Sequence, residues 1–483
     1  MKFFQKSSLL KFSVAIILIG IFVFLRLYQL PSSLNFFGDI GRDFIKLQNW
    51  QRTGKPPFLV PITSVISFNQ SAIYFYYLYP FYLLSGGSPF ATTYAAIFLY
   101  IAGFILGLFL LRKKPKWQNR LYIIFFLITI NPVFIEHHRY VWNPSLIAPF
   151  LIAAFFLLLS LKKKFELKLA AAFGLCLATA VSLNYSVVPA VFVLWLVGMW
   201  VLNWQQRFKL FGLSLASGLL LNLPTLAFEL RHNFFLTKKL PSQELLQKSV
   251  TLKTKLVTFG NNLLSLPPQL KSNNLYLLIV AAMIVGLIAL GHYFHQQGKT
   301  SKFSPFCLSS VLLLLTIFLT LLTPFRMHSH YLYGVLSLLF VTISFLPKKL
   351  MIIALLLFSL IWLDPSQIRA QFRPAEFTLK EKQACLKQIC QEFKQPLYLN
   401  LNSKSHNHQA LGYIFLARKQ NCQVVSAVDL PQQPTNYMAV INQNAQYDSN
   451  KTGYYELTIF GDKQLIKEES CSEGLSYSLF KKN

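Results

Sequence analysis

Long apolar runs are the feature that most constrains what this chain can fold into. Runs at 9–27, 90–111, 275–291 and 311–322 with its flanks reach or approach the ~17–20 residues that a helix needs to cross ~30 Å of hydrocarbon. The whole chain of 483 residues is 54% hydrophobic and 15% aromatic, with a mean hydropathy of +0.44. A water-soluble globule has no use for so many apolar positions. The sequence therefore predicts a mainly α-helical, polytopic membrane protein.

The basic residues predict how the chain is oriented. A net charge of +29 would suggest a nucleic-acid partner for a soluble protein, but here many of the Lys and Arg residues cluster in short loops between apolar runs. Such loops stay cytoplasmic and meet anionic headgroups, so no nucleic-acid partner is expected. The first run follows Lys2 and Lys6, but it is too long for a signal peptide and has no small-residue cleavage site. We expect an uncleaved first span with a cytoplasmic N-terminus.

One Tyr-rich segment decides the number of spans. Residues 71–84, "SAIYFYYLYPFYLL", are apolar but short, with five Tyr and an internal Pro. If this segment crossed the membrane, the later basic loops would lie outside, so we expect residues 71–85 to be interfacial or re-entrant at the outer face. About eleven spans are then predicted, near 10–29, 90–111, 119–135, 144–161, 168–184, 186–203, 209–227, 273–295, 304–323, 331–346 and 349–363. An odd number leaves the rest of the chain outside.

The tail differs in composition and predicts a second domain. We expect a membrane-embedded domain at 1–363, with its first outer loop at 30–89, and a small exterior α/β domain at 364–483. The tail holds eleven of the 17 acidic residues. Its pattern predicts a helix at 380–393 and strands at 397–402, 423–428, 437–442 and 455–460.

The tail also contains four of the six cysteines, Cys385, Cys390, Cys422 and Cys471. These can form disulfides in an exterior compartment. Cys385 and Cys390 lie five residues apart on the predicted helix, so they should not pair with each other. The remaining connectivity is open, and no CxxC metal spacing is present.

Acidic residues are scarce before the tail, with only six in residues 1–363. Two of them, Asp39 and Asp43, fall in the first outer loop and would share one face of a helix. A carboxylate there can act as a general base, and pairing raises the pKa of one partner. Arg42 should lie on a neighbouring face and could pair elsewhere. The alternative for Asp39 is an N-cap of a helix at 40–52.

Other polar residues gather where distant predicted spans reach the outer face. They are Glu136, His137, His138, Arg139, Glu229, Arg231, His232, Arg326, His328 and His330. Basic side chains there can hold a phosphate, Arg best because its fork matches phosphate oxygens. The alternatives are a solvated loop at 136–139 and an interfacial anchor at 228–234. The His328–His330 spacing is a weak metal signal, so no metal site is predicted and divalent-metal dependence is left open.

These features together resemble a known group of enzymes. An acid within "FFGDIGRDF", a Gly-Lys-Pro-Pro break at 54–57, the Tyr-rich segment, many spans and an outer tail resemble the GT-C membrane glycosyltransferases. The likeness covers roughly 10–330; the chain is similar to the protein O-mannosyltransferase and aminoarabinose-transferase branch, and most of all to poorly characterised bacterial members of that group. That family's first outer loop carries Asp-Glu, whereas here Asp39 is followed by Ile40. Whether Asp43 replaces the second acid is open.

The resemblance implies a GT-C-like fold and an inverting transfer from a polyprenyl-phosphate sugar donor on the outer face of the cell membrane. We predict Asp39 as the general base, with Asp43 or Glu136 orienting the acceptor or tuning the base. The predicted substrate-binding residues are Arg326 and His330 first, then Arg231, His232 and Arg139, with Arg42 and His137. The acceptor would be a hydroxyl of a lipid, glycan or protein.

Two other functions remain open. One is a lipid-linked oligosaccharide ligase or polymerase that uses Arg and His of a large outer loop at 229–272. The other is a transporter of lipid or polysaccharide, a class that places polar groups near the bilayer midplane. The nearly charge-free centres of the predicted spans argue against transport.

Overall fold

The computed structural model describes residues 2–36, 38–62, 69–239, 251–264, 304–323, 328–403, 410–426, 433–444 and 458–483. These residues form two compact units. The first contains Met1–Tyr28, Pro57–Phe81 and Phe90–Gln371, and the second contains Gln29–Pro56, Tyr82–Pro89 and Phe372–Asn483. The second unit thus joins the tail to two pieces of the first outer loop, which the sequence alone groups with the membrane domain.

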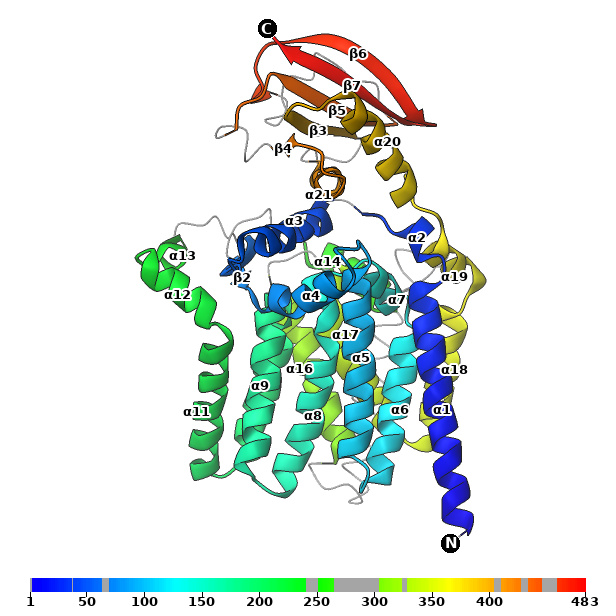
Figure 1. Ribbon diagram of the computed structural model, residues 1–483. Coiled ribbons are helices and arrows are strands. Elements are labelled where there is room, and N and C mark those ends of the chain that lie inside the picture. The colour runs from blue at the N-terminus through cyan, green and yellow to red at the C-terminus, as the bar shows by residue number, and fades with distance from the viewer. Residues whose placement is uncertain are drawn as a thin grey trace. The chain divides into compact units, whose positions relative to one another are not determined.

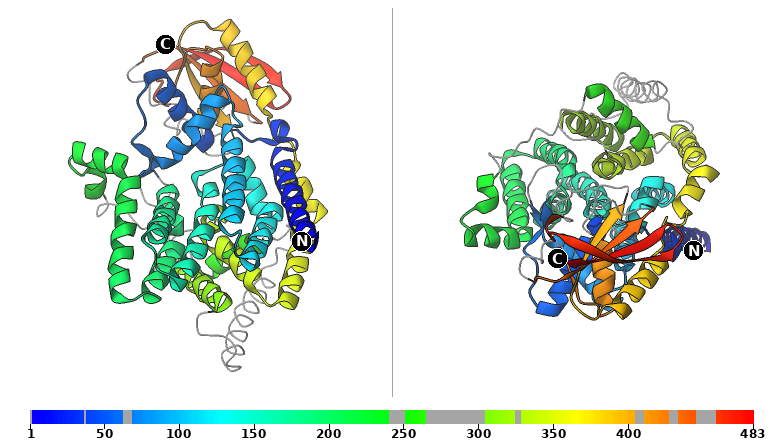
Figure 2. Two further views of the ribbon diagram at one scale, coloured as in Figure 1. Left: turned by 60° about the horizontal axis from the view of Figure 1, so that its bottom comes forward. Right: turned by 90° about the horizontal axis from the view of Figure 1, so that it is seen from above.

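The first unit is a helical bundle (Figure 1). Its longer helices are α1 (Lys2–Leu27), α5 (Ala91–Leu110), α6 (Pro115–Ile130), α8 (Ala148–Lys163), α9 (Leu167–Leu183), α10 (Val188–Trp200), α11 (Trp204–Leu221), α14 (Leu252–Leu264), α16 (Pro305–Leu322), α17 (Tyr333–Phe345) and α18 (Lys348–Trp362). Shorter elements are β1 (Leu59–Ile62), β2 (Asn69–Ser71), α4 (Ile73–Leu84), α7 (Pro132–Arg139), η1 (Asn143–Leu146), η2 (Tyr185–Val187), α12 (Leu223–Arg231), α13 (Phe235–Lys239), η4 (Ser329–Leu332) and α19 (Pro365–Phe372). In the right-hand view of Figure 2, the bundle helices are seen nearly end-on.

The bundle packs through apolar and small side chains. α17 is buried along almost its whole length, because α6, α8, α10, α16 and α18 pack against it. Small residues allow close approach elsewhere: a Cβ on Gly174 of α9 would lie 2.8 Å from the Ser214 Cα of α11. Helices in lipid associate largely through such close packing, because burial of apolar surface gives them little advantage there.

The apolar helices identify the chain as a membrane protein. Within the described residues, four helices are long and apolar enough to cross a membrane, or up to seven if each of three bent helix pairs is one span. The bends are 67° between α6 and α7, 65° between α11 and α12, and 54° between α18 and α19. The other predicted spans are shorter apolar helices or, for 273–295, lie outside the described residues. The count of eleven stays a prediction.

The Tyr-rich segment forms the helix α4. In Figure 1 it lies at a steep angle to α5. Tyr77 Oη donates to the Ala95 carbonyl oxygen at 2.7 Å, and the Phe81 ring lies 5.4 Å from that of Phe98. Because both partners belong to α5, aromatic side chains fix α4 to that helix.

The second unit is an α/β domain with a mixed sheet. Its elements are α2 (Leu30–Ser33), α3 (Gly38–Thr53), α20 (Leu379–Glu392), β3 (Leu397–Ser403), α21 (Leu411–Lys419), β4 (Val424–Val425), β5 (Tyr437–Gln443), β6 (Lys463–Ser472) and β7 (Leu475–Lys482). The strand order is β4-β3-β5-β7-β6, with β3 parallel to β4 and β5, and the other pairs antiparallel. In register, Tyr398 faces Met438 and Met438 faces Phe480.

The tail thus confirms the predicted helix at 380–393 and the strands near 397–402 and 437–442, while the strand predicted at 423–428 is reduced to Val424–Val425. The strand predicted at 455–460 is wrong where the structure describes it: Thr458–Phe460 form the end of a helix and a turn. The apolar signal there reflects burial instead, since Phe460 packs with Tyr398 and Met438 in the core.

Two disulfides fix α20. Cys385 pairs with Cys471 of β6, and Cys390 pairs with Cys422 beyond α21. The expectation that Cys385 and Cys390 do not pair with each other is confirmed.

Candidate active site

The helix α3 carries the two predicted carboxylates. Its buried face is formed by Ile40, Gly41, Phe44 and Leu47, which follow helical spacing. α3 begins at Gly38, so Asp39 lies in its first turn. A negative charge is stabilised there by the unpaired N–H groups and the helix dipole.

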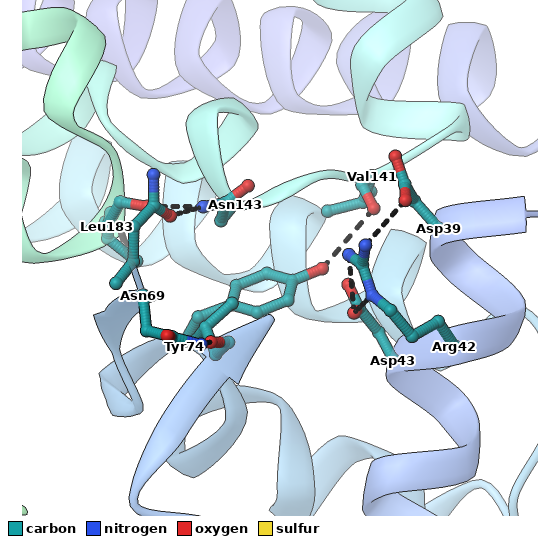
Figure 3. A network of polar contacts seen from close by, with 10 residues as sticks. Asp39, Arg42, Asp43, Asn69, Tyr74, Val141, Asn143 and Leu183 are labelled. Carbon is teal, nitrogen blue, oxygen red and sulfur yellow. Dashed lines mark hydrogen bonds and ion pairs between the residues drawn. The ribbon is translucent and has the colours of Figure 1, made fainter. Parts of the chain in front are cut away.

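Arg42 joins the two carboxylates (Figure 3). Its Nη1 lies 2.6 Å from Asp39 Oδ1, while Nη2 and Nε lie 3.0 and 3.1 Å from Asp43 Oδ1. Arg42 therefore pairs with the two carboxylates themselves, and the alternative that it pairs elsewhere is not what these ion pairs show. The long guanidinium reaches back by one turn to Asp39 and sideways to Asp43.

The two carboxylates differ in their surroundings. The Asp39 side chain is 55% exposed, whereas that of Asp43 is 7% exposed. Burial raises the pKa of Asp43 from its usual 3.8 to about 6, and Arg42 opposes this shift. The raised pKa thus belongs to Asp43 and comes mainly from burial, while the charge of Asp39 is a smaller cause.

The tail holds α3 in place within the second unit. The backbone of α21 passes so close that a Cβ on Gly41 would lie 2.3 Å from the Gly412 nitrogen. The Phe44 and Phe415 rings lie 5.0 Å apart, and Phe36 packs on Phe415 at 5.6 Å. The segment before α3 is also tied down, since the buried Lys382 of α20 donates to the Phe36 carbonyl oxygen at 3.1 Å. Burial lowers the pKa of Lys382 to about 8.

In the first unit, a helix break creates a polar centre around Arg26. Pro132 cannot continue the hydrogen-bond ladder, so α6 ends at Ile130 and α7 starts afresh with an Asn131 cap. Arg26 of α1 is fully buried. It donates to the carbonyl oxygens that lose their helical partners at this break, those of Thr129 at 2.7 Å and Ile128 at 2.8 Å. Its Nε also lies 3.3 Å from His138 Nδ1.

Arg139, predicted to bind substrate, lies at the end of α7. Its Nη1 donates to the carbonyl oxygens of Tyr28 at 2.7 Å and Arg26 at 3.3 Å, at the C-terminal end of α1. Cations at helix C-termini satisfy carbonyls that have lost their helical partners. Arg26 of α1 therefore caps the C-terminal end of α6, and Arg139 of α7 caps the C-terminal end of α1.

The structure brings His137 and His330 together, although they are far apart in sequence. Their ring centroids lie 6.3 Å apart, and His137 Nε2 lies 3.2 Å from Ser329 Oγ. Trp142 packs edge-on against His330 at 4.8 Å. The Nδ1 of His137 and the Nε1 of Trp142 are buried and have no hydrogen-bond partner in the described part of the chain. The indole Nε1 is a donor, and His137 Nδ1 is a donor or an acceptor depending on the tautomer, so both can meet a polar group of a ligand.

His328 stacks on His330 with ring centroids 5.5 Å apart, whereas Arg231 and His232 do not join this pair. Glu136 is exposed on α7. Arg231 is exposed at the end of α12, where His232 stacks on Phe228 of the same helix at 4.0 Å. In the described residues, no hydrogen bond or ring contact links Arg231 or His232 to His137 or His330. Arg326 lies outside the described residues.

Glu229 of α12 has a structural role, because its side chain caps the start of α13. Its carboxylate accepts from the backbone N–H groups of Leu236 at 2.8 Å and Thr237 at 2.9 Å, which begin α13. Among the residues described, no group of three or more His, Cys, Asp or Glu side chains is arranged to hold a metal ion.

Some residues that organise the site, or their partners, could not be predicted from the sequence. Arg26 is one, and its signal is a charge near the end of an apolar run. The partners of Asn143 and Tyr74 were not predicted either: Asn143 donates to Gln70 and, at 2.6 Å, to the Leu183 carbonyl oxygen, and Tyr74 reaches the Val141 carbonyl oxygen at 3.4 Å (Figure 3). These bonds join β2, α4, α9 and the loop after α7.

Comparison with known proteins gives a match of fold. No protein-family model matches the sequence, and no match was found among curated proteins. Among solved structures, ArnT from Cupriavidus metallidurans in the apo state matches with a TM-score of 0.57 and 11% identity, covering 96% of this chain and 97% of that one. The same protein bound to undecaprenyl phosphate matches with a TM-score of 0.57, 10% identity and the same coverage. The chain therefore has the fold of ArnT, and the GT-C-like architecture expected from the sequence is confirmed.

Proposed function

We propose that this protein is an integral membrane glycosyltransferase that moves a sugar from a polyprenyl-phosphate donor to an acceptor hydroxyl. The observation that carries the proposal is the half-exposed Asp39, held by Arg42 in the first turn of α3. The shared fold supports the donor class, because one of the ArnT structures is bound to undecaprenyl phosphate.

Asp39 acts as the general base in this mechanism. Arg42 occupies its Oδ1, and the described residues place no partner on Oδ2. The acceptor O–H gives its proton to Oδ2, and the acceptor oxygen bonds to the anomeric carbon. The bond from that carbon to the phosphate oxygen breaks, and its electrons leave with the lipid phosphate. A single displacement of this kind inverts the anomeric centre.

The departing phosphate needs fixed donors. Within the first unit, His137, whose buried Nδ1 has no partner among the described residues, and His330 beside it stay candidates for this role. Arg231, His232 and Arg326 stay candidates, and Glu136 and Asp43 stay candidates for orienting the acceptor. Arg139 is assigned to helix capping instead, since its guanidinium donates to main-chain carbonyls.

We place the active site and the C-terminal domain on the outer face of the cell membrane, with the N-terminus in the cytoplasm. The basic loops support this orientation through the positive-inside rule. The two disulfides of the second unit support it independently, because disulfides persist in oxidising exterior compartments.

Transfer from a labelled donor tests the proposal. Membranes containing the protein are given polyprenyl-phosphate [¹⁴C]hexose, and the label is followed from the lipid phase into other lipids, glycans and proteins. We expect label to leave the lipid only where the protein is present. If label stays on the lipid for hexose, pentose and amino-sugar donors alike, the proposed activity is wrong and lipid flipping becomes the function to test.

A further inference from the structure

One guanidinium serves two carboxylates on α3. The Nη1 of Arg42 bonds to Asp39, and its Nη2 and Nε bond to Asp43, each through the Oδ1 atom of the acid. Two carboxylates four residues apart on a helix repel each other when both are ionised. The shared cation offsets that repulsion and leaves the trio with one net negative charge.

The burial of Asp43 makes this arrangement depend on Arg42. The Asp43 side chain is almost wholly buried, so its anion needs a bonded cation. Lys46 of α3 also acts on Asp43, but with a weaker effect than Arg42. On α21, which packs against α3, Arg418 donates to the Val424 carbonyl oxygen and Lys419 to that of Gly87. Arg42 is thus the main cation that serves Asp43.

We infer that Arg42 is a positioning residue that holds Asp39 by one oxygen and couples its ionisation to that of Asp43. The inference rests on the proposed function, in which the other oxygen of Asp39 takes the acceptor proton. When Asp39 gains that proton, its bond to Nη1 weakens, and the guanidinium charge is left to Asp43. When Asp43 is protonated instead, the guanidinium charge is left to Asp39, and Arg42 binds Asp39 more tightly.

A titration without any substrate tests the coupling. The sequence contains six Asp residues, so the full-length protein in lipid nanodiscs, labelled with [¹³Cγ]Asp, gives few carboxyl signals. The signals of Asp39 and Asp43 are assigned with Asp39→Asn and Asp43→Asn. In the wild type, we expect the Asp39 signal to show a second inflection at the pH where Asp43 titrates. This inflection should vanish in Asp43→Asn and in Arg42→Gln.

An Asp39 signal with a single inflection in the wild type would overturn the inference. So would a second inflection that persists in Arg42→Gln, because the coupling would then not pass through Arg42. This result is independent of the proposed activity, since no donor or acceptor is used.

The transfer assay gives the second measurement. Arg42→Lys keeps the charge but loses the fork, and Arg42→Gln loses both. We expect transfer at saturating donor to fall about 100-fold in Arg42→Gln, the order of loss that follows misplacement of a reacting group, with partial rescue in Arg42→Lys. The pH profile of Arg42→Lys should also shift, which a loss of folding alone would not cause.

An unchanged profile and rate in both variants would contradict the inference. Absence of transfer by the wild type would instead contradict the proposed function, while the titration still decides the role of Arg42.

Discussion

The backbone of Gly412 in α21 lies against Gly41 in α3, so close that a Cβ on Gly41 would be 2.3 Å from the Gly412 nitrogen and 2.5 Å from its Cα. The two residues are far apart in sequence, yet their contact fixes the helix that carries Asp39 and Asp43. The tail thereby sets the position of α3 within the second unit.

Replacing Gly41 with Ala should therefore disturb both stability and activity. Since the contact is with backbone atoms, no side chain can move aside, and the cost should exceed the ~1–3 kcal/mol typical of overpacking. We expect a lower thermal midpoint of the second unit and reduced transfer. Gly212→Ala is the matched control, because a Cβ added at Gly212 would have nothing within 4 Å. Equal midpoints in the two variants would contradict the close contact.

Asp43 predicts a pH dependence with a definite sign. Its pKa in the folded protein, about 6, is above its usual 3.8, so folding favours the protonated acid. This contribution to stability is fully present below 3.8 and is lost as the pH rises through about 6. Thermal midpoints measured from about pH 4 to 8 should show the wild type losing stability relative to Asp43→Asn over that window. Parallel curves would show that burial of Asp43 carries no such cost.

The same residue should shape the activity profile. If the ionised pair is the active form, transfer by the wild type rises as the pH passes about 6. Asp43→Asn should lack this acid limb. A limb at the same pH in both proteins would assign it to another group.

The Arg26 cap predicts a loss of stability in the first unit. Arg26→Met keeps an apolar stem but leaves the Thr129 and Ile128 carbonyls without their donor. An unsatisfied buried acceptor costs about 1–3 kcal/mol, so the detergent-solubilised protein should unfold at a clearly lower temperature. Lys113→Met, at an exposed position, is the control. Equal midpoints would mean that the carbonyls at the helix break find other partners.

The two disulfides should differ in their effect on the second unit. Cys385–Cys471 closes 86 residues and Cys390–Cys422 closes 32. In the chain-entropy model, removing the larger loop costs about 0.9 kcal/mol more at 25 °C. The urea midpoint for proteolysis should thus fall further in the Cys385→Ser, Cys471→Ser double variant than in Cys390→Ser, Cys422→Ser. The reverse order would contradict the entropic explanation for this pair.

The local patterns of the sequence predicted the helices well. Apolar runs marked the bundle helices because each run is buried or faces lipid along its length. The i, i+4 spacing of Asp39 and Asp43 predicted their shared helix, and the spacing of Cys385 and Cys390 predicted that they pair with other cysteines.

Long-range partners left no such signal. Nothing local to Gly41 indicates that α21 packs against it, and nothing in the Arg26 segment indicates the helix break at Pro132. The β6–β7 hairpin was missed because irregular register between Leu465 and Lys467 and between Ser470 and Ser472 interrupts the alternation. Helical spacing alone places Arg42 on a different face of α3 from Asp43. Its role could therefore be recognised only from the geometry of its side chain.

Transfer by Asp39→Asn, compared with the wild type at matched expression, tests the central claim most directly. Asn keeps the size of the side chain but cannot take the acceptor proton. Membranes of each protein are supplied with labelled polyprenyl-phosphate hexose, and a normal elution profile confirms that the variant is folded. We predict that label leaves the lipid with the wild type alone. Equal transfer by both proteins would show that Asp39 is not the base and would move the search to Arg231 and His232.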